Sequence, residues 1–221
     1  MNIAGSSIQL DLITILLTVP IVATWIAFAR HIIGLKSFGV FTSMMLTFIF
    51  FELGLNGQQQ SEPLNGLKYG LILVVLIFLT TTLAYGIIKG WSLHYQPKIA
   101  IIVTLVTLVL SSIIIISIRF NLMDLIRLDL ISLVAILVLA EKFIGILSRK
   151  NFRVALFVFA ETTIVAVIGY LIISWNELTQ LLLDYPLIIL LLLPVNYLLG
   201  KYTGLRVREF YRFRNILDSE E

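Results

Sequence analysis

The chain has 221 residues, of which 59% are hydrophobic and 13% charged, and its mean hydropathy is +1.03. Soluble domains have about 45–50% apolar and about 25% charged residues, so this composition excludes an ordinary soluble domain and indicates an integral membrane protein. The absence of cysteine excludes disulfides, cysteine-ligated metals and thiol nucleophiles. The net charge of +3 comes from basic residues scattered over several loops and a tail, a pattern that indicates membrane topology instead of nucleic-acid binding.

Seven apolar runs, separated by gaps too short for a folded soluble domain, are each long enough to cross a bilayer, which takes about 20 residues of helix. Because lipid offers the backbone no hydrogen-bond partners, each run can cross only as a helix. We therefore predict an all-α polytopic membrane protein with a seven-transmembrane-helix bundle over residues 1–204 and a basic-aromatic cytoplasmic tail over residues 205–221. The predicted spans cover about 10–29, 38–55, 69–88, 99–118, 128–147, 154–175 and 186–202.

Three local features add detail to the first and fifth predicted spans. The first apolar run has no Lys or Arg ahead of it and no small-residue cleavage pattern after it, so we expect a retained span and not a signal peptide. Pro20 lies in the middle of this span, where it is expected to kink the helix. Ahead of the fifth span, apolar residues at helical spacing within 119–129 predict a short surface helix.

A basic elbow connects the first two spans and contains Arg30, His31 and Lys36. A connection of so few residues makes the two helices antiparallel neighbours. Positive charge beside a span marks its cytoplasmic end. We therefore expect the elbow to face the cytoplasm.

The distribution of Lys and Arg over the span ends tests this orientation. Three basic residues, Lys68, Arg119 and Arg127, belong to one set of ends, and Lys142 lies within a span. The other set of ends holds twelve, namely Arg30, Lys36, Lys89, Lys98, Arg149, Lys150, Arg153, Lys201, Arg206, Arg208, Arg212 and Arg214. The asymmetry alternates along all seven spans, which predicts an outside amino terminus and a cytoplasmic carboxyl terminus.

Four polar residues within the predicted spans form a candidate intramembrane cluster: Glu141, Lys142, Glu161 and Asn196. An ionisable group at the centre of a span costs about 2.5–3.5 kcal/mol on insertion scales, so such groups face the bundle interior and pair there. We favour a buried polar network that fixes helix packing, and leave open a working site such as a path for protons or substrate. Our specific hypothesis is that Glu161 pairs with Lys142 or Arg30.

The carboxyl-terminal tail interleaves arginines with aromatic residues. As a helix it would press its aromatic side chains onto the inner leaflet while the arginines meet lipid phosphates. We favour this lipid anchoring, with docking of a cytoplasmic partner as the alternative. The arginines concerned are Arg206, Arg208, Arg212 and Arg214.

The sequence offers no catalytic or metal-binding motif. Neither His31 nor His94 has a carboxylate or a second histidine at ligand spacing, so we expect no metal site. There is no Gly-rich phosphate loop, zincin motif or nucleophile elbow. Because no nucleophile can be paired with a base by spacing, we expect no enzyme and no cofactor.

Three stretches together resemble a bacterial seven-helix membrane domain usually found fused to an inactive transglutaminase-like domain. They are AFAR at 27–30 with GLKSFG at 34–39, AEK at 140–142, and NYLLGKYTG at 196–204 leading into REFYRFR at 208–214. In that family the transglutaminase-like part precedes the helices on the extracytoplasmic side, which agrees with an outside amino terminus. The 221 residues hold no counterpart of that part.

The resemblance further implies the company of ATP-grasp peptide ligases and protease-like proteins, and a distant likeness to the membrane subunit of poly-γ-glutamate capsule synthesis. It supplies no catalytic residues. We therefore expect a non-enzymatic, multi-pass scaffold or transducer in the cytoplasmic (inner) membrane, placing an extracytoplasmic transglutaminase-like partner opposite a cytoplasmic ATP-grasp ligase. The rival is a transport role for an anionic peptide-like polymer or protons, and a homo-oligomer is left open. A continuous polar cavity would favour transport, whereas a closed core with a charged cytoplasmic face would favour the scaffold.

Overall fold

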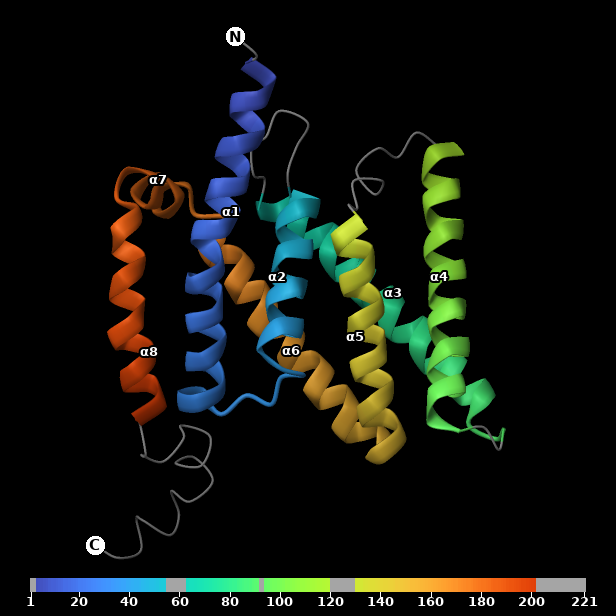
Figure 1. Ribbon diagram of the computed structural model, residues 1–221. Coiled ribbons are helices and arrows are strands. Elements are labelled where there is room, and N and C mark those ends of the chain that lie inside the picture. The colour runs from blue at the N-terminus through green and yellow to red at the C-terminus, as the bar shows by residue number, and fades with distance from the viewer. Residues whose placement is uncertain (1–2, 55–62, 92–93, 120–129, 202–221) are drawn as a thin grey trace, which may run out of the picture.

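The computed structural model describes residues 3–54, 63–91, 94–119 and 130–201. These residues are helical almost throughout, with no strand among them, which confirms the predicted all-α class (Figure 1). The helices are α1 (Ile3–Phe28), α2 (Val40–Gly54), α3 (Pro63–Ile88), α4 (Tyr95–Arg119), α5 (Leu130–Arg149), α6 (Phe152–Ile173), α7 (Asn176–Asp184) and α8 (Leu192–Lys201). A π-helical turn, Ala29–Ile33, extends α1, and a 3-10 segment, Pro186–Leu191, joins α7 to α8.

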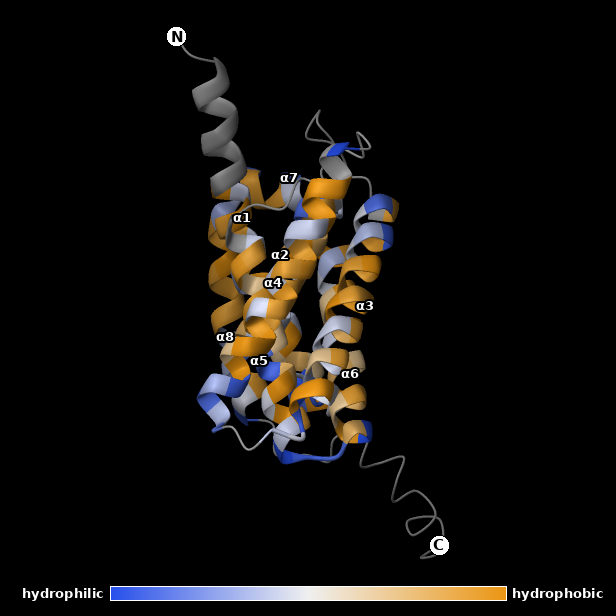
Figure 2. Ribbon diagram, turned by 90° about the vertical axis from the view of Figure 1, so that its right-hand side faces the viewer, coloured by the Kyte–Doolittle hydropathy of each residue, from blue (hydrophilic) through white to orange (hydrophobic). Residues whose placement is uncertain are grey.

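Several helices meet the length and composition that a membrane crossing requires. Four segments are long and apolar enough, namely Ile13–Ile33, Leu64–Ile88, Tyr95–Ile116 and Phe152–Ile173. Hydrophobic residues fill the length of the helices, and hydrophilic residues gather at the two ends of the bundle (Figure 2). The chain is therefore a polytopic all-α membrane protein.

The last predicted span, 186–202, begins directly after a short helix, α7, that was not predicted from the sequence. The segments Asn176–Asp184 and Pro186–Lys201 meet at an angle of 102°, and they make a fifth crossing if the bent pair is counted as one span. The bend falls at Pro186, whose ring removes a backbone donor and disfavours helical geometry at the residue before it. As a result α7 lies across one end of the bundle and α8 runs back along it (Figure 1).

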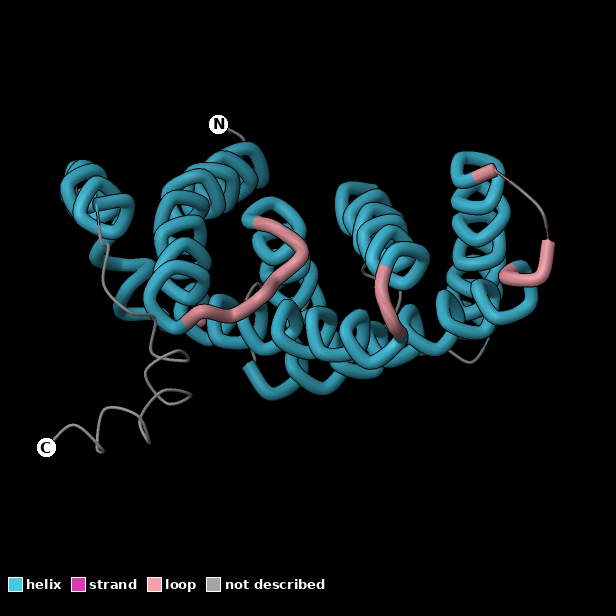
Figure 3. The backbone as a smooth tube through the Cα atoms, turned by 90° about the horizontal axis from the view of Figure 1, so that it is seen from below, coloured by secondary structure: helices cyan, strands magenta, loops and turns pink. Residues whose placement is uncertain are grey.

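The helices form two layers. Seen along the bundle, α8, α1, α2, α5 and α4 stand in one row, and α6 and α3 run obliquely across one face of that row (Figures 1 and 3). The apolar helix α2 lies at the centre and contacts α1, α3, α5 and α6. With 15 residues it is only about 22 Å long, because residues 34–39 before it are not helical.

Two side chains, one from α1 and one from α2, donate hydrogen bonds to backbone carbonyl oxygens of α6. Trp25 Nε1 of α1 donates to the Val165 carbonyl at 3.0 Å. Thr47 Oγ1 of α2, which is fully buried, lies 3.3 Å from the Ala166 carbonyl and 3.0 Å from the Ser43 carbonyl. These bonds hold α6 in a defined position against α1 and α2.

Four phenylalanines fill the space where α3, α5, α6 and the elbow meet. The ring centroids of Phe78, Phe143 and Phe159 lie 5.2 Å from one another. Phe38 of the elbow lies edge-on to Phe159 and Phe143, at 6.2 and 6.5 Å. This aromatic cluster packs the bundle interior directly next to the elbow.

The predicted grouping of the span ends agrees with the structure. The elbow, the turn between α3 and α4, the turn between α5 and α6, and the end of α8 all lie at one end of the bundle, which we call the basic end (Figure 1). The amino-terminal part of α1 and α7 lie at the other end. The assignment of the basic end to the cytoplasm stays a prediction. The predicted surface helix, beyond Arg119, and the basic tail at 205–221 lie outside the described residues.

Candidate functional site

The elbow begins where α1 ends in the π-helical turn. The backbone N–H groups of Gly34 and Leu35 both donate to the Ala29 carbonyl, each at 3.1 Å. Gly34 has φ +88°, a left-handed conformation that any other residue would adopt with strain. This turn contains Arg30 and His31. After it the chain leaves the α1 axis and runs toward α6.

Two adjacent side chains of α6 hold the elbow in place. The Lys36 backbone N–H donates to the Glu161 carboxylate, and the Phe38 backbone N–H donates to Thr162 Oγ1 at 3.1 Å. Thr162 is fully buried, and its hydroxyl donates in turn to the Val158 carbonyl at 2.7 Å. Glu161 therefore acts on the elbow as a positioning group, through the backbone of Lys36.

The four residues of the predicted intramembrane cluster lie in three separate contacts. Glu161 meets the elbow as described. Lys142 Nζ lies 3.8 Å from the carboxylate of Glu141, with the two side chains 49% and 45% exposed. Asn196 Nδ2 donates to Thr24 Oγ1 at 2.8 Å. Among the described residues these three contacts are separate from one another, and the ion pair of Lys142 is with its sequence neighbour. A network that joins all four residues stays a prediction.

The contact of Asn196 joins α8 to α1. Thr24 is buried, accepts the amide of Asn196 and donates to the Pro20 carbonyl at 2.8 Å. A single interhelical hydrogen bond is typical of an isolated Asn within a membrane-spanning helix. Its partner Thr24 was not among the predicted site residues.

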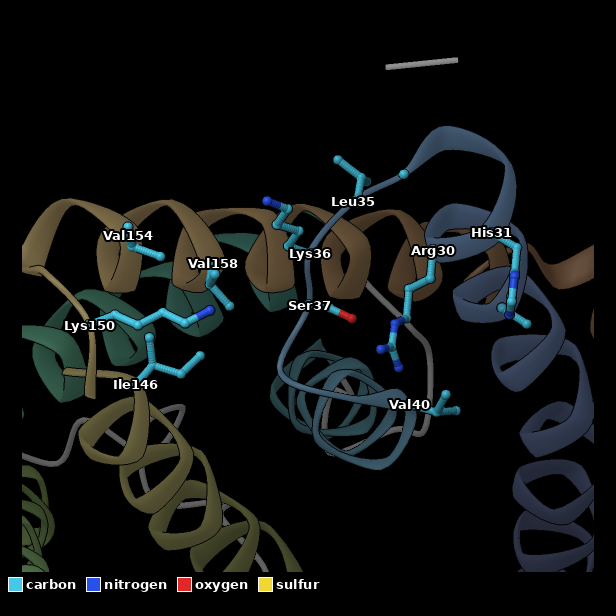
Figure 4. A pocket seen from close by; sticks show the side chains of 12 residues that line it. Arg30, His31, Leu35, Lys36, Ser37, Val40, Ile146, Lys150, Val154 and Val158 are labelled. Carbon is cyan, nitrogen blue, oxygen red and sulfur yellow. The ribbon is translucent and has the colours of Figure 1, made fainter. Parts of the chain in front are cut away.

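A pocket of about 490 Å³ opens at the elbow. Arg30 extends into it from α1 and Lys150 from the α5–α6 turn, with Ser37 between them, whereas His31 and Lys36 point away (Figure 4). The Ser37 hydroxyl is buried and has no hydrogen-bond partner within the described part of the chain. The lining residues are Ala27, Arg30, His31, Gly34, Leu35, Lys36, Ser37, Val40, Ile146, Lys150, Val154 and Val158. No acidic residue is among them.

Two further pockets open at the basic end and share Lys150 with the first. One, of about 500 Å³, is lined by residues that include Lys89, Arg149 and Asn151. The other, of about 310 Å³, includes the Glu141–Lys142 pair. The Arg149 guanidinium also lies over the ring of Tyr95, 5.8 Å from its centroid. The basic end is therefore a cationic surface with several concave sites.

Sequence reasoning missed several residues of this arrangement. From the sequence, Lys150 was counted only among the basic residues that indicate orientation, although it lines all three pockets. Ser37 and Thr162 carry no pattern that would single them out. Glu52 of α2 accepts a hydrogen bond from Ser132 of α5, and a carboxylate within an apolar span was a signal that could have identified it.

Comparison with known proteins identifies the family. Residues 7–217 match the family model described as seven transmembrane helices usually fused to an inactive transglutaminase. No curated protein and no solved structure matches the chain, so the distant resemblance to the capsule-synthesis subunit is not confirmed. Among the residues that the structure describes, no group of three His, Asp or Glu side chains could hold a metal ion. Because the match spans nearly the whole chain, the protein belongs to the family of seven transmembrane helices usually fused to an inactive transglutaminase.

Proposed function

We propose that this protein is a non-enzymatic scaffold or transducer of the cytoplasmic membrane, which presents its basic end to a cytoplasmic partner. The observation that carries the proposal is the contrast between a packed apolar interior and a concave cationic end. Phe78, Phe143 and Phe159 fill the interior next to the pockets. A protein of this form offers a docking surface, and the three pockets described above all open at its basic end.

The partners follow from the family and from charge. Members are usually fused to an inactive transglutaminase, so the extracytoplasmic partner is a transglutaminase-like domain. The resemblance of the sequence implies an ATP-grasp peptide ligase as the cytoplasmic partner. We infer that its docking surface is acidic, because complementary charge steers association and fixes register. Lys89, Arg149 and the four arginines of the tail would meet it, the first two from the rim of one pocket.

The rival transport role has less support. A route for protons or an anionic polymer needs polar groups in sequence along the bundle. Glu161, Asn196 and the Glu141–Lys142 pair instead lie in three separate contacts. Two of these contacts hold the elbow and α8 in place, which supports a structural role.

The test is crosslinked copurification from native membranes in mild detergent, with the copurifying proteins identified by mass spectrometry. We expect a peptide ligase and a transglutaminase-like protein. The ligase should be lost when Arg206, Arg208, Arg212 and Arg214 are changed to Gln, because the tail docks it.

A matched control removes the basic residues of the opposite ends, Lys68, Arg119 and Arg127, and should retain the ligase. Equal retention by both variants would contradict docking at the basic end. A chain that comes out alone, and that carries protons into liposomes unless Glu161 is changed to Gln, would establish transport instead.

A further inference from the structure

The pocket at the elbow combines a cationic centre with apolar walls. Arg30 and Lys150 enter it from opposite sides (Figure 4). Ala27, Val40, Ile146, Val154 and Val158 supply the walls. A site of this composition suits a ligand that is anionic at one end and apolar at the other.

The groups at the centre of the pocket are donors suited to a phosphate. The guanidinium of Arg30 presents a planar fork that binds two phosphate oxygens, and Lys150 adds a point charge. The buried Ser37 hydroxyl, without a protein partner in the described part of the chain, supplies a third donor. A buried hydroxyl left unbonded is costly, and a phosphate oxygen in the pocket would satisfy it.

The residues that line the pocket include basic side chains and no acidic one. The ion pair found among the described residues is that of Lys142 with Glu141. Glu161, on the neighbouring α6, directs its carboxylate to the backbone N–H of Lys36. The pocket therefore keeps a net positive charge that favours an anion.

The pocket lies at the end of the membrane-crossing helices, where phospholipid headgroups lie. Its walls come from the last turns of α1 and α5 and the first turns of α2 and α6. Basic pockets between transmembrane helices on the cytoplasmic side suit anionic headgroups. A soluble phosphate would use the donors and leave the valine and isoleucine walls in water, whereas a lipid would cover them.

We propose that this pocket binds the phosphate of an anionic phospholipid, held between Arg30 and Lys150 with the Ser37 hydroxyl as third donor, and with the glycerol and upper acyl chain against the apolar walls. Bound in this way, the lipid joins the end of α1 to the α5–α6 turn. It thereby stabilises the elbow at the centre of the basic end.

The test measures phosphatidylglycerol binding to the purified full chain in neutral detergent, by native mass spectrometry and by the shift in melting temperature. Phosphatidylcholine serves as the neutral comparison. We expect phosphatidylglycerol to be retained, and changing both Arg30 and Lys150 to Gln to weaken its binding about tenfold or more. The change of Ser37 to Ala should weaken it by a smaller factor, about threefold.

The matched control changes Lys98 and Lys201 to Gln. Both belong to the basic end and neither lines the pocket, so this variant should bind phosphatidylglycerol within about twofold of the unchanged chain. Equal loss in the control and the pocket variant would overturn the proposal, because it would mean that general surface charge attracts the lipid. Circular dichroism verifies folding, and Lys150→Gln alone, an exposed change, decides the matter if the double variant does not fold.

Inorganic phosphate and glycerol 3-phosphate form the second arm of the experiment. We expect neither to shift the melting temperature, nor to displace phosphatidylglycerol, at concentrations where the lipid saturates the site. Displacement by either would assign the site to a soluble phosphate and overturn the lipid proposal. The assay uses the purified chain without partners, so its outcome is independent of whether the scaffold proposal holds.

Discussion

The helices α6 and α8 are both mostly apolar but differ in how much of their surface is buried. Nine residues of α6 are buried, and it contacts α1, α2, α3 and α5. In α8 only Leu199 is buried among its ten residues, and side chains such as Leu193 and Leu198 are 66% and 65% exposed. The helix α6 belongs to the second layer and crosses the row, whereas α8 lies at one end of the row (Figure 3).

The difference teaches what holds helices together within a bilayer. Lipid tails are as apolar as leucine, so an apolar helix gains little from leaving lipid for protein. Close approach at small residues and interhelical hydrogen bonds decide the neighbours instead. The helix α6 has several such contacts, whereas α8 has the bond from Asn196 to Thr24. Substitutions around α6 should therefore destabilise the fold more than substitutions on α8.

The largest effect is expected where Tyr170 of α6 lies between two glycines of neighbouring helices. A Cβ at Gly66 would lie 2.2 Å from Tyr170 Oη and 2.7 Å from the Phe50 carbonyl oxygen. Gly66→Ala should therefore lower the free energy of unfolding by about 1–3 kcal/mol. The control is Gly86→Ala on the same helix, where a Cβ meets nothing within 4 Å, so stability should not fall.

A rescue experiment separates the two glycines. At Gly54 the added Cβ clashes with Tyr170 Oη at 2.3 Å, and its next neighbour is 3.2 Å away. Removing the hydroxyl by Tyr170→Phe should recover most of the stability lost by Gly54→Ala. The same change should not rescue Gly66→Ala, because the Phe50 backbone stays in the way. Equal rescue of both would contradict this packing. Unfolding in mixed micelles, followed by circular dichroism, measures the stability of Gly54→Ala, of Gly66→Ala, and of each of them combined with Tyr170→Phe.

The next effect concerns the hold of α6 on the elbow. Thr162→Val removes the acceptor of the Phe38 N–H and should cost about 1–3 kcal/mol, because that partly buried donor loses its partner. Thr163→Val is the matched control, since Thr163 Oγ1 donates only to the Phe159 carbonyl of its own helix, and it should cost less. Reversed magnitudes in the same unfolding assay would show that Thr162 does not position the elbow.

A smaller effect is expected for the attachment of α8. The hydrogen bond between Asn196 and Thr24 should contribute about 0.6 kcal/mol, the average for such bonds in membrane proteins. A double-mutant cycle with Asn196→Leu and Thr24→Val measures this coupling energy. A coupling energy as large as the effect of Thr162→Val would contradict the contrast between the two helices.

The smallest effect is expected for the exposed pair on α5. Glu141→Gln should change the free energy of unfolding by no more than about 0.5 kcal/mol, because Lys142 and Glu141 are both about half exposed. Raising the salt concentration should change the stability of the unchanged chain just as little. A marked loss of stability from this single substitution would instead support the buried polar network predicted from the sequence.

Composition and charge were sufficient for the class of the fold and for the grouping of the span ends. Apolar runs of about 20 residues can only be helices in lipid, and the alternation of Lys and Arg separates the two ends. The two layers could not be predicted in the same way. The apolar residues of α2 are spread around its whole circumference. Its sequence therefore does not show which face meets α6 and which meets α5.

The candidate site was only partly accessible to prediction. Arg30 stood out as a charge beside a span, and it does line the elbow pocket. The pairing of Glu161 with a cationic side chain stays a prediction. Its carboxylate also accepts a hydrogen bond from the Lys36 backbone N–H, a donor that every residue except proline has and that no sequence pattern singles out. The short helix α7 did have signals, because Leu178, Leu181 and Leu182 follow helical spacing and Pro186 ends the segment.

The orientation of the basic end is the claim on which both proposals depend, and one measurement tests it directly. The chain contains no cysteine, so a single cysteine at Gln59 or at Asn151 can be labelled selectively with an impermeant maleimide. In sealed cells we expect the cysteine at position 59 to react, and the one at position 151 to react only after the membrane is opened. The reverse pattern, or labelling of both from one side, would contradict the account.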